Sequence, residues 1–171
     1  MSSTPDQGGS PTPGLVPREE VIRQSGLELL QGMLAGRYPP PPMAVTLGFR
    51  LSEVGPGRAI FEGVPDMRHY NPLGIVHGGW AATVLDSCLG CAVHSIVPKG
   101  AGYTTLEIKV HFVRPITTGT GLLRAIGTVI HPGRQVATAD GQLVDAQGKV
   151  FAHGTATCLI FPIEDAARRR S

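Results

Sequence analysis

The sequence predicts an α+β domain in which one antiparallel β-sheet curls around a single long α-helix, with an extra N-terminal helix ahead of it. Three observations support this fold class. Helical periodicity occurs in only two stretches, and short β-type runs separated by glycine turns make up most of the remainder. Their order is two strands, one apolar helix and four strands. A length of 171 residues fits one domain.

The chain ahead of the sheet divides into three segments. Residues 1–17 hold Ser, Thr, Pro and Gly with almost no apolar side chains, so we expect a flexible tail. Residues 18–38 carry two early glutamates and apolar side chains at helical spacing, which predicts an amphipathic helix weakened at Gly26 and Gly32. Residues 39–42 are all proline and predict a stiff, extended connector.

The main domain is expected over residues 43–162. Residues 43–54 and 58–64 flank a Gly-Pro-Gly turn and predict a β-hairpin. A loop then leads to the long apolar helix, residues 79–96. Four further strand-like runs cover residues 103–114, 121–130, 135–144 and 150–161. Residues 163–171, with three arginines, predict a solvated C-terminal tail.

The composition is that of a globular protein without a large charge excess. Hydrophobic residues make up 42% and charged residues 16%, and the formal net charge is +2, so we expect no nucleic acid partner. No stretch approaches the roughly 18 consecutive apolar residues of a membrane span, and the N-terminus lacks signal-peptide features. We therefore expect a cytoplasmic protein without a membrane partner. Three cysteines give no disulfide framework.

A single carboxylate, Asp86, interrupts the long apolar helix. Burial of an unpaired carboxylate costs several kcal/mol, and aspartate is a mediocre helix former, so core packing alone does not explain it. One interpretation is a catalytic base or nucleophile. The alternative is a structural aspartate that is hydrogen-bonded or faces solvent.

The sequence His77-Gly78-Gly79 comes directly before this helix. A helix N-terminus presents unpaired amide hydrogens and the positive end of the helix dipole, so a substrate carbonyl placed there would find an oxyanion site. Glycine at positions 78 and 79 would let a ligand approach the backbone closely. A simple tight turn into the helix is the other interpretation.

Gly78 and Asp86 are too far apart to act together within one chain. Their eight-residue separation along one helix corresponds to a distance on the order of 12 Å. Acyl transfer needs the nucleophile and the oxyanion donors within roughly 3 Å of the reacting group. If both residues act on one carbonyl, two antiparallel copies of the helix must meet across a two-fold axis. The functional hypothesis therefore requires a homodimer.

Two segments carry a resemblance to a known family: HYNPLGIVHGGWAATVLDSCLGCAV, and YTTLEIKVHFVRPI after it. The chain from Ser25 to Phe161 resembles the hotdog-fold acyl-CoA thioesterases of the PaaI-type, phenylacetate-degradation group. The resemblance implies a five- or six-stranded antiparallel sheet around a long helix, in dimers that usually pair into homotetramers. It also implies hydrolysis of acyl-CoA without a metal or organic cofactor.

The same resemblance implies roles for individual residues. Gly78 would supply the amide that polarises the thioester carbonyl, aided by His77, while Asp86 of the other subunit would activate water or attack directly. Asn71 matches the asparagine that helps to orient the water or the thioester. Thr105 occupies the position of a serine or threonine beside the carboxylate. Some relatives place a glutamate at a neighbouring helix position, whereas this chain has only Asp86.

The acyl group, aromatic or of medium length, would lie between the two subunits. Candidate substrate contacts are Gly79, Trp80 and Thr83, and Arg134 is a candidate for the CoA phosphates. Further candidate cations are Lys109, Arg114 and Arg68. Each has a simpler interpretation, which is core packing for the helix residues and a solvated surface position for each cation.

Other sites and functions were weighed against this reading. Cys88 and Cys91 have redox-like spacing, but they fall in mid-helix, where core packing explains them better. His94 does not complete a metal site with them, because six residues turn a helix by roughly 600°. Two other functions stay open. The protein could bind acyl-CoA without turnover, as a sensor or carrier, or it could be a hotdog dehydratase or hydratase. Release of free thiol separates hydrolysis from both.

Overall fold

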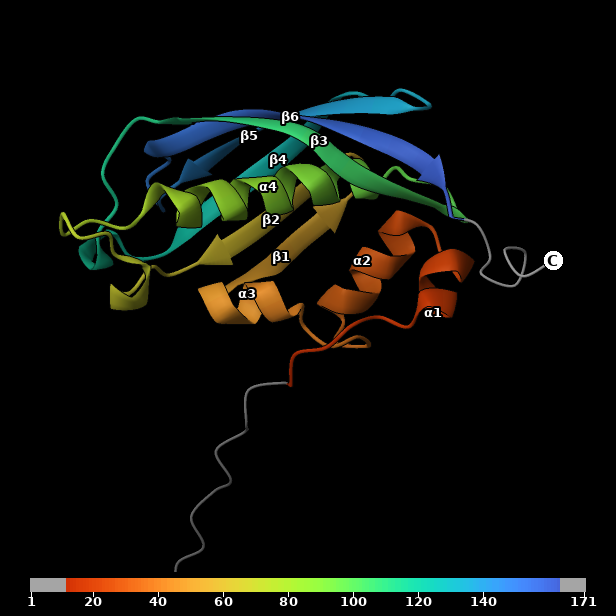
Figure 1. Ribbon diagram of the computed structural model, residues 1–171, viewed down its shortest axis with the longest axis horizontal. Helices are drawn as coiled ribbons and strands as arrows, with labels where there is room; N and C mark the ends of the chain where they lie inside the picture. Colours follow the sequence, from red (N-terminus) through yellow and green to blue (C-terminus); the bar gives the residue numbers. More distant parts are fainter. Residues whose placement is uncertain (1–11, 164–171) are drawn as a thin grey trace, which may run out of the picture.

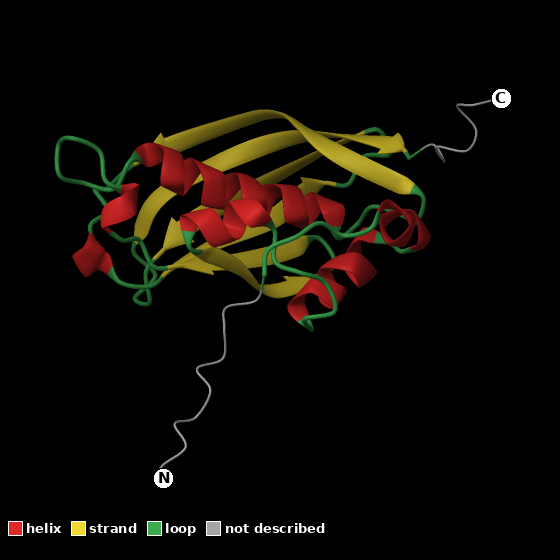
Figure 2. Ribbon diagram, turned by 60° about the horizontal axis from the view of Figure 1, so that its bottom comes forward, coloured by secondary structure: helices red, strands yellow, loops and turns green. Residues whose placement is uncertain are grey.

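The computed structural model describes residues 12–163 and shows a six-stranded antiparallel sheet wrapped around one long helix (Figures 1 and 2). The strand order is β1-β2-β4-β5-β6-β3. The long helix α4 (Gly78–His94) follows the hairpin in sequence, and the chain then crosses to the opposite sheet edge as β3 (Ala101–Phe112). The predicted fold class is confirmed. Residues 1–11 and 164–171 of the expected tails lie outside the described residues.

Apart from the start of β1, the remaining strands lie close to their predicted positions. They are β1 (Phe49–Gly55), β2 (Arg58–Gly63), β4 (Leu123–His131), β5 (Val136–Val144) and β6 (Val150–Pro162). The order makes β1 and β3 the two edge strands, although they belong to distant parts of the sequence. The curled sheet therefore has an opening between these two edges, over one side of α4.

One side of α4 forms the centre of the hydrophobic core. Val84, Leu85 and Leu89 are completely buried, and α4 contacts every strand of the sheet. The opposite side, which carries Asp86 and Cys91, is only partly buried. This stripe of the helix faces the opening in the sheet.

The single helix expected over residues 18–38 is instead two helices, α1 (Arg18–Arg23) and α2 (Gly26–Leu34). The break has a clear cause in the capping box at Ser25. Its hydroxyl accepts the Glu28 amide at 3.3 Å, and the Glu28 carboxylate accepts the Ser25 amide at 2.8 Å. These two bonds satisfy backbone donors that a continuous helix would pair internally, so a new helix starts here.

Backbone contacts attach the N-terminal segment to the domain. The Gly26 amide donates to the carbonyl of Val97 at 3.0 Å. A Cβ at position 26 would lie 1.8 Å from the carbonyl oxygen of His94, so only glycine permits this approach. The Gly14 amide donates to the carbonyl of Pro40 at 3.1 Å, so this part of the expected flexible tail contacts the connector.

The first part of the strand expected over residues 43–54 is a third helix, α3 (Pro42–Leu47). Pro42 occupies its first position, where a proline has no hydrogen bond to lose. Gly48, with a φ of 67°, ends the helix in the left-handed conformation. The connector therefore leads into a helix turn, and β1 begins only at Phe49.

Residues 30–44, which we call the N-terminal cover, include the end of α2, the connector and the start of α3. Both helices contact β1. Figure 2 shows the N-terminal helices on the open side of the curved sheet. The cover therefore lies over the part of α4 that the sheet leaves exposed.

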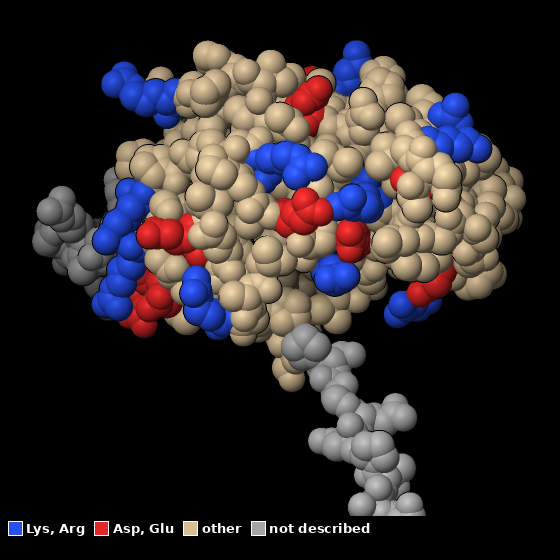
Figure 3. All heavy atoms as spheres, turned by 180° about the vertical axis from the view of Figure 1, so that it is seen from behind, with Lys and Arg blue, Asp and Glu red and all other residues tan. Residues whose placement is uncertain are grey.

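The surface carries charges of both signs. On the face shown in Figure 3, Lys and Arg side chains lie among Asp and Glu side chains. On β1, β2 and β4, Glu62 pairs with Arg50 and with Arg124, each at 3.2 Å. Such exposed pairs contribute at most about 1 kcal/mol each. Within residues 12–163, no helix combines the length and apolar character needed to cross a membrane.

Candidate active site

Asp86 lies on the partly exposed stripe of α4 and faces β3. The Thr105 hydroxyl donates a hydrogen bond to Asp86 Oδ1 at 3.1 Å. The register between β3 and β6 shifts between Thr105 and Glu107, which leaves Leu106 as the extra residue of a bulge. Bulges redirect side chains. Here Thr105 reaches the carboxylate, while Leu106 is 59% exposed.

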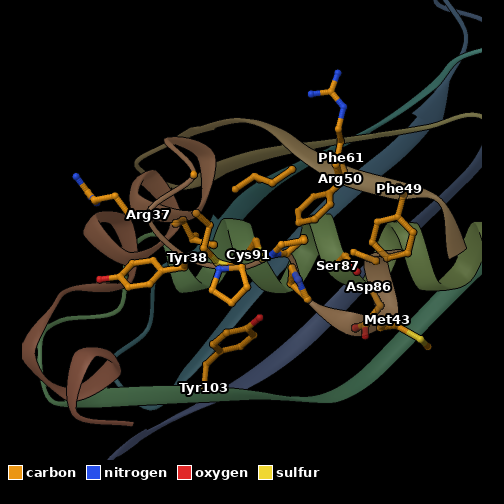
Figure 4. Close-up of a pocket in the computed structure, with 18 of the residues that line it drawn as sticks. Arg37, Tyr38, Met43, Phe49, Arg50, Phe61, Asp86, Ser87, Cys91 and Tyr103 are labelled. Atoms are coloured by element: carbon orange, nitrogen blue, oxygen red, sulfur yellow. The ribbon is translucent and has the colours of Figure 1, made fainter. Parts of the chain in front are cut away.

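Asp86 lines a cavity of about 500 Å³ between the N-terminal cover, β1, α4 and β3. This volume falls within the roughly 300–1,000 Å³ of typical small-molecule sites. Much of the lining is apolar, with Leu30, Met33, Phe49 and Phe61. Figure 4 shows Asp86, Ser87 and Met43 at one end of this cavity and Arg37 and Tyr38 at the other.

The middle of the cavity is lined by Cys91 and Tyr103. Burial raises the pKa of Cys91 to about 12 and raises the pKa of Tyr103 well above its usual value. The Tyr103 ring packs on His94 at 5.0 Å between centroids, and burial lowers the pKa of His94 to about 4. None of these three side chains therefore carries a charge at neutral pH.

The N-terminus of α4 belongs to a different cavity, of about 430 Å³. His77 is the N-cap, and its Nδ1 accepts the Gly79 amide at 2.8 Å. A Cβ at position 79 would lie 2.8 Å from this nitrogen, which explains the second glycine of the pair. Because Nδ1 is an acceptor, Nε2 carries the proton of the neutral ring and is free to donate to a ligand.

Gly78 presents an unpaired backbone donor in this second cavity. Its amide donates no hydrogen bond to any other residue in the described part of the chain, as expected for the first residue of a helix. A Cβ at this position would lie 3.1 Å from the ring of Phe112. Phe112 ends β3 and is 56% exposed. The donor therefore lies beside an aromatic ring that is accessible in the single chain.

Asn71 lines the same cavity as His77 and Gly78. Its Oδ1 accepts the amides of Leu73 at 2.9 Å and Ile75 at 3.4 Å, which holds the loop before α4. The side-chain oxygen is thus committed to the loop. The side-chain nitrogen is left as a donor toward a ligand.

The candidate residues therefore line two separate cavities, each of which would be one half-site of the hypothesis. Asp86 and Thr105 line the first cavity, and Asn71, His77 and Gly78 line the second. Eight residues of helix separate Gly78 from Asp86, a distance on the order of 12 Å. As the spacing in the sequence indicated, a single chain does not join the two halves.

Other expected substrate contacts lie elsewhere. Trp80 is 3% exposed, and its indole N–H donates to the carbonyl of Leu47 at 2.9 Å, so it anchors the end of α3 within the core. The Thr83 hydroxyl donates to the carbonyl of Gly79 at 2.8 Å, and Thr83 lines neither cavity. Arg134 lines a third cavity, near Ile96 beyond the end of α4, because it belongs to the β4–β5 turn.

The cysteine pair is part of the packing of α4. Cys88 is completely buried, its thiol donates to the carbonyl of Leu85 at 3.2 Å, and burial raises its pKa. The reactive thiolate is therefore disfavoured at both Cys88 and Cys91. Within residues 12–163, no group of three or more His, Cys, Asp or Glu side chains is arranged to hold a metal ion.

Sequence reasoning missed the cavity residues contributed by the N-terminal cover, and it missed Tyr103. The only sequence signal for the cavity residues of the N-terminal cover was the apolar face predicted for residues 18–38. That signal did not indicate which surface the helix would cover. Tyr103 carried no distinguishing signal, because an aromatic residue is common in any strand.

Comparison with known proteins identifies the family. The family model described as the thioesterase superfamily matches residues 73–152, which include His77, Gly78, Asp86 and Thr105. The solved structure of a putative thioesterase, a phenylacetic acid degradation-related protein from Ralstonia eutropha JMP134, is 33% identical with a TM-score of 0.69. The match covers 76% of this chain and 98% of that one. This chain belongs to the thioesterase superfamily.

Two further relatives agree with this family. A putative esterase of Caenorhabditis elegans is 30% identical over 111 residues, 64% of each chain, so this chain spans less than two thirds of that relative. The human acyl-coenzyme A thioesterase 13 is 27% identical over 108 residues, 63% of this chain and 76% of the relative. The predicted hotdog thioesterase family is confirmed, and the predicted enzyme class, a thioester hydrolase, is the class that this family defines.

Proposed function

We propose that this protein hydrolyses acyl-CoA thioesters in an active site formed between two subunits of a homodimer. The observation that carries this proposal is the division of the site within one chain. Asp86, held by Thr105, lines an apolar cavity, whereas the unpaired Gly78 amide lines another, on the order of 12 Å away along the helix. The name of the human relative, acyl-coenzyme A thioesterase 13, supports acyl-CoA as the substrate.

The outer edge of β3 is the proposed dimer contact. β3 pairs with β6 on one side, and no strand in residues 12–163 occupies its other side. An unpaired edge of this kind is a template for a further strand. Its exposed apolar side chains, Leu106 and Phe112, would be buried by such pairing. Pairing of dimers into homotetramers remains a further prediction.

The positions of residues along β3 favour this arrangement. Antiparallel pairing of two β3 strands, about a two-fold axis midway between Thr105 and Phe112, places Thr105 opposite Phe112 of the partner subunit. Thr105 holds Asp86, and Phe112 packs against Gly78. The carboxylate of each subunit would therefore approach the helix N-terminus of the other. The symmetry gives two equal sites.

In the composite site, the thioester oxygen would accept hydrogen bonds from the Gly78 amide and from His77 Nε2. These donors stabilise the negative charge that develops on that oxygen. Thr105 holds Asp86 Oδ1, which leaves Oδ2 to take a proton from the attacking water or to attack the carbonyl carbon itself. Asn71 would orient the water or the thioester through its side-chain nitrogen. Attack by water gives the free acid and the CoA thiol directly. Attack by Asp86 expels the CoA thiolate and leaves a mixed anhydride, which water then hydrolyses to the free acid and the regenerated carboxylate.

Arg114 is the best placed of the candidate cations for the CoA phosphates. It lines the cavity that contains Gly78, and one guanidinium nitrogen is fixed by the carbonyl of Val150. Arg68, by contrast, is paired with Asp66 at 2.6 Å. Its charge is therefore already compensated.

The test is thiol release from aromatic and straight-chain acyl-CoAs by the wild type and by Asp86→Asn. Asparagine keeps the shape and the oxygen that accepts from Thr105, but it is neither base nor nucleophile. We expect release by the wild type and a fall in kcat/KM on the order of a hundredfold or more in the variant. Binding of acyl-CoA by the wild type without any release would instead favour a non-catalytic sensor or carrier.

A further inference from the structure

We infer that the N-terminal cover supplies the acyl pocket of its own subunit, and that Tyr38 sets the longest straight acyl chain that this pocket accepts. The inference rests on the proposed function for its substrate, but it concerns a different part of the molecule. The residues that carry it lie in the segment from α1 to the connector, and Tyr38 itself lies between α2 and the connector.

The cavity extends from the carboxylate toward the cover. Asp86 lies at one end, Cys91 and Tyr103 line the middle, and Tyr38 lies at the other end (Figure 4). The apolar walls come from both sources, with Leu30 and Met33 on the cover and Phe49 and Phe61 on β1 and β2. Arg37 and Arg50 also line the cavity, but most of its walls are apolar. A largely apolar cavity that begins at the proposed catalytic carboxylate is suited to the hydrocarbon part of a substrate.

Packing and hydrogen bonds fix the position of Tyr38. A Cβ at Gly32 would lie 2.6 Å from Cε2 of the Tyr38 ring, so the ring rests directly on the backbone of α2. Its hydroxyl accepts from Gln24 Nε2 at 2.5 Å and donates to Glu20 Oε2 at 3.2 Å. The side chain is thus held by α1 and α2 together.

This anchoring explains why Tyr38 would limit chain length. In Figure 4 the Tyr38 ring extends away from Asp86, so the ring occupies the space into which a longer chain would continue. Removal of the ring would lengthen the cavity toward α1. Each additional methylene group that becomes buried favours binding about fourfold.

The experiment measures kcat/KM for straight-chain acyl-CoAs from hexanoyl to hexadecanoyl with the wild type, Tyr38→Ala and Tyr38→Phe. We expect the ratio of long-chain to short-chain kcat/KM to rise on the order of tenfold in Tyr38→Ala, equivalent to about two further buried methylenes. Tyr38→Phe keeps the ring and loses only the hydroxyl, so its ratio should match the wild type. An unchanged length profile in Tyr38→Ala would overturn the inference.

A substitution that makes the cavity smaller provides an independent test if Tyr38→Ala fails to fold. Met33→Phe adds volume inside the cavity and should lower the same ratio. Thermal unfolding followed by circular dichroism establishes that each variant is folded at the assay temperature. A Met33→Phe variant that is folded and keeps the wild-type profile would also count against the inference.

Binding of non-hydrolysable S-alkyl-CoA thioethers, from hexyl to hexadecyl, separates this inference from the proposed function. If thiol is released but its dependence on acyl-chain length is the same in the wild type and Tyr38→Ala, the inference is refuted and the proposed function stands. Absence of release, with thioether binding that shifts to longer chains in Tyr38→Ala, would refute hydrolysis and support the pocket. Absence of both release and binding would refute both.

Discussion

Asp86 and Gly78 lie on the same helix but line different cavities. Because the helix is rigid, no side-chain rotation spans a separation on the order of 12 Å. A carboxylate suits the activation of water, and a backbone amide suits the binding of a carbonyl oxygen. Thioester hydrolysis by both groups requires that they meet at one thioester. The relationship between these two residues is therefore the main structural argument for a site shared by two subunits.

The hydrogen bond from Thr105 to Asp86 should matter for catalysis more than for folding. Thr105→Ala leaves the carboxylate free to rotate, and we expect kcat/KM to fall about tenfold, since a hydrogen bond to a charged group contributes roughly 1.5–3 kcal/mol. Thr105→Ser should restore most of the loss. Thr104→Ala, at the exposed neighbouring position, is the matched control. Equal rates for Thr105→Ala and Thr104→Ala would show that the bond has no such role.

His77 caps α4, and two substitutions can separate this structural role from the chemical role that we propose for it. His77→Asn keeps an N-cap acceptor for the Gly79 amide, so its free energy of unfolding should stay close to that of the wild type. His77→Ala should lose about 1 kcal/mol of stability. Both lack the Nε2 donor, and kcat should fall on the order of tenfold or more in each. Full activity in a stable His77→Asn protein would limit His77 to capping.

The edge of β3 should determine the oligomeric state. Leu106→Arg introduces a charge at the proposed contact, so we expect analytical ultracentrifugation to detect monomers and thiol release to be lost with the dimer. Ile130→Arg is the matched control, because Ile130 is 61% exposed on β4, away from this edge. A dimeric, active Leu106→Arg protein would place the subunit contact elsewhere.

The partly buried His94 should make stability depend on pH. Burial lowers its pKa to about 4, below the ordinary 6.5, so between these values the unfolded chain binds a proton that the folded chain does not. Stability is therefore fully present above about pH 6.5 and is lost as the pH falls toward 4, by at most about 3 kcal/mol. Urea unfolding across this range measures the effect. The dependence of the free energy of unfolding on pH should become weaker in His94→Gln. If this dependence is the same in His94→Gln and the wild type, other groups cause the effect.

The sequence predicted the parts of the fold that rest on local signals. Glycine turns and alternating apolar residues located the later strands, and the run around Val84 and Leu89 located α4. The α3 helix was missed although Pro42 and Gly48 mark its two ends, because the apolar residues between them also fit a strand. The break at Ser25 was likewise present in the sequence as a capping box.

The site was only partly predictable. Asp86, Gly78 and His77 were candidates because of their residue types and their positions in or directly before the long helix. Asn71 and Thr105 were candidates only through the family resemblance. The cavity beside Asp86 is lined jointly by the N-terminal cover, α4 and β3, which are distant in sequence, so no single segment carries a pattern that reveals it. Trp80 was indistinguishable from a substrate contact, because an indole suits both a core and a ligand pocket.

Mixed dimers of two inactive variants test the shared site most directly. Asp86→Asn removes the carboxylate, and Asn71→Asp removes a donor of the other half-site while keeping the oxygen that holds the loop. Each variant alone should release little thiol. In a purified mixed dimer, two-fold symmetry assembles one intact and one doubly altered site, so we predict about half of the wild-type rate. A mixed dimer that is stably associated but as inactive as its parents would contradict a site built from two subunits.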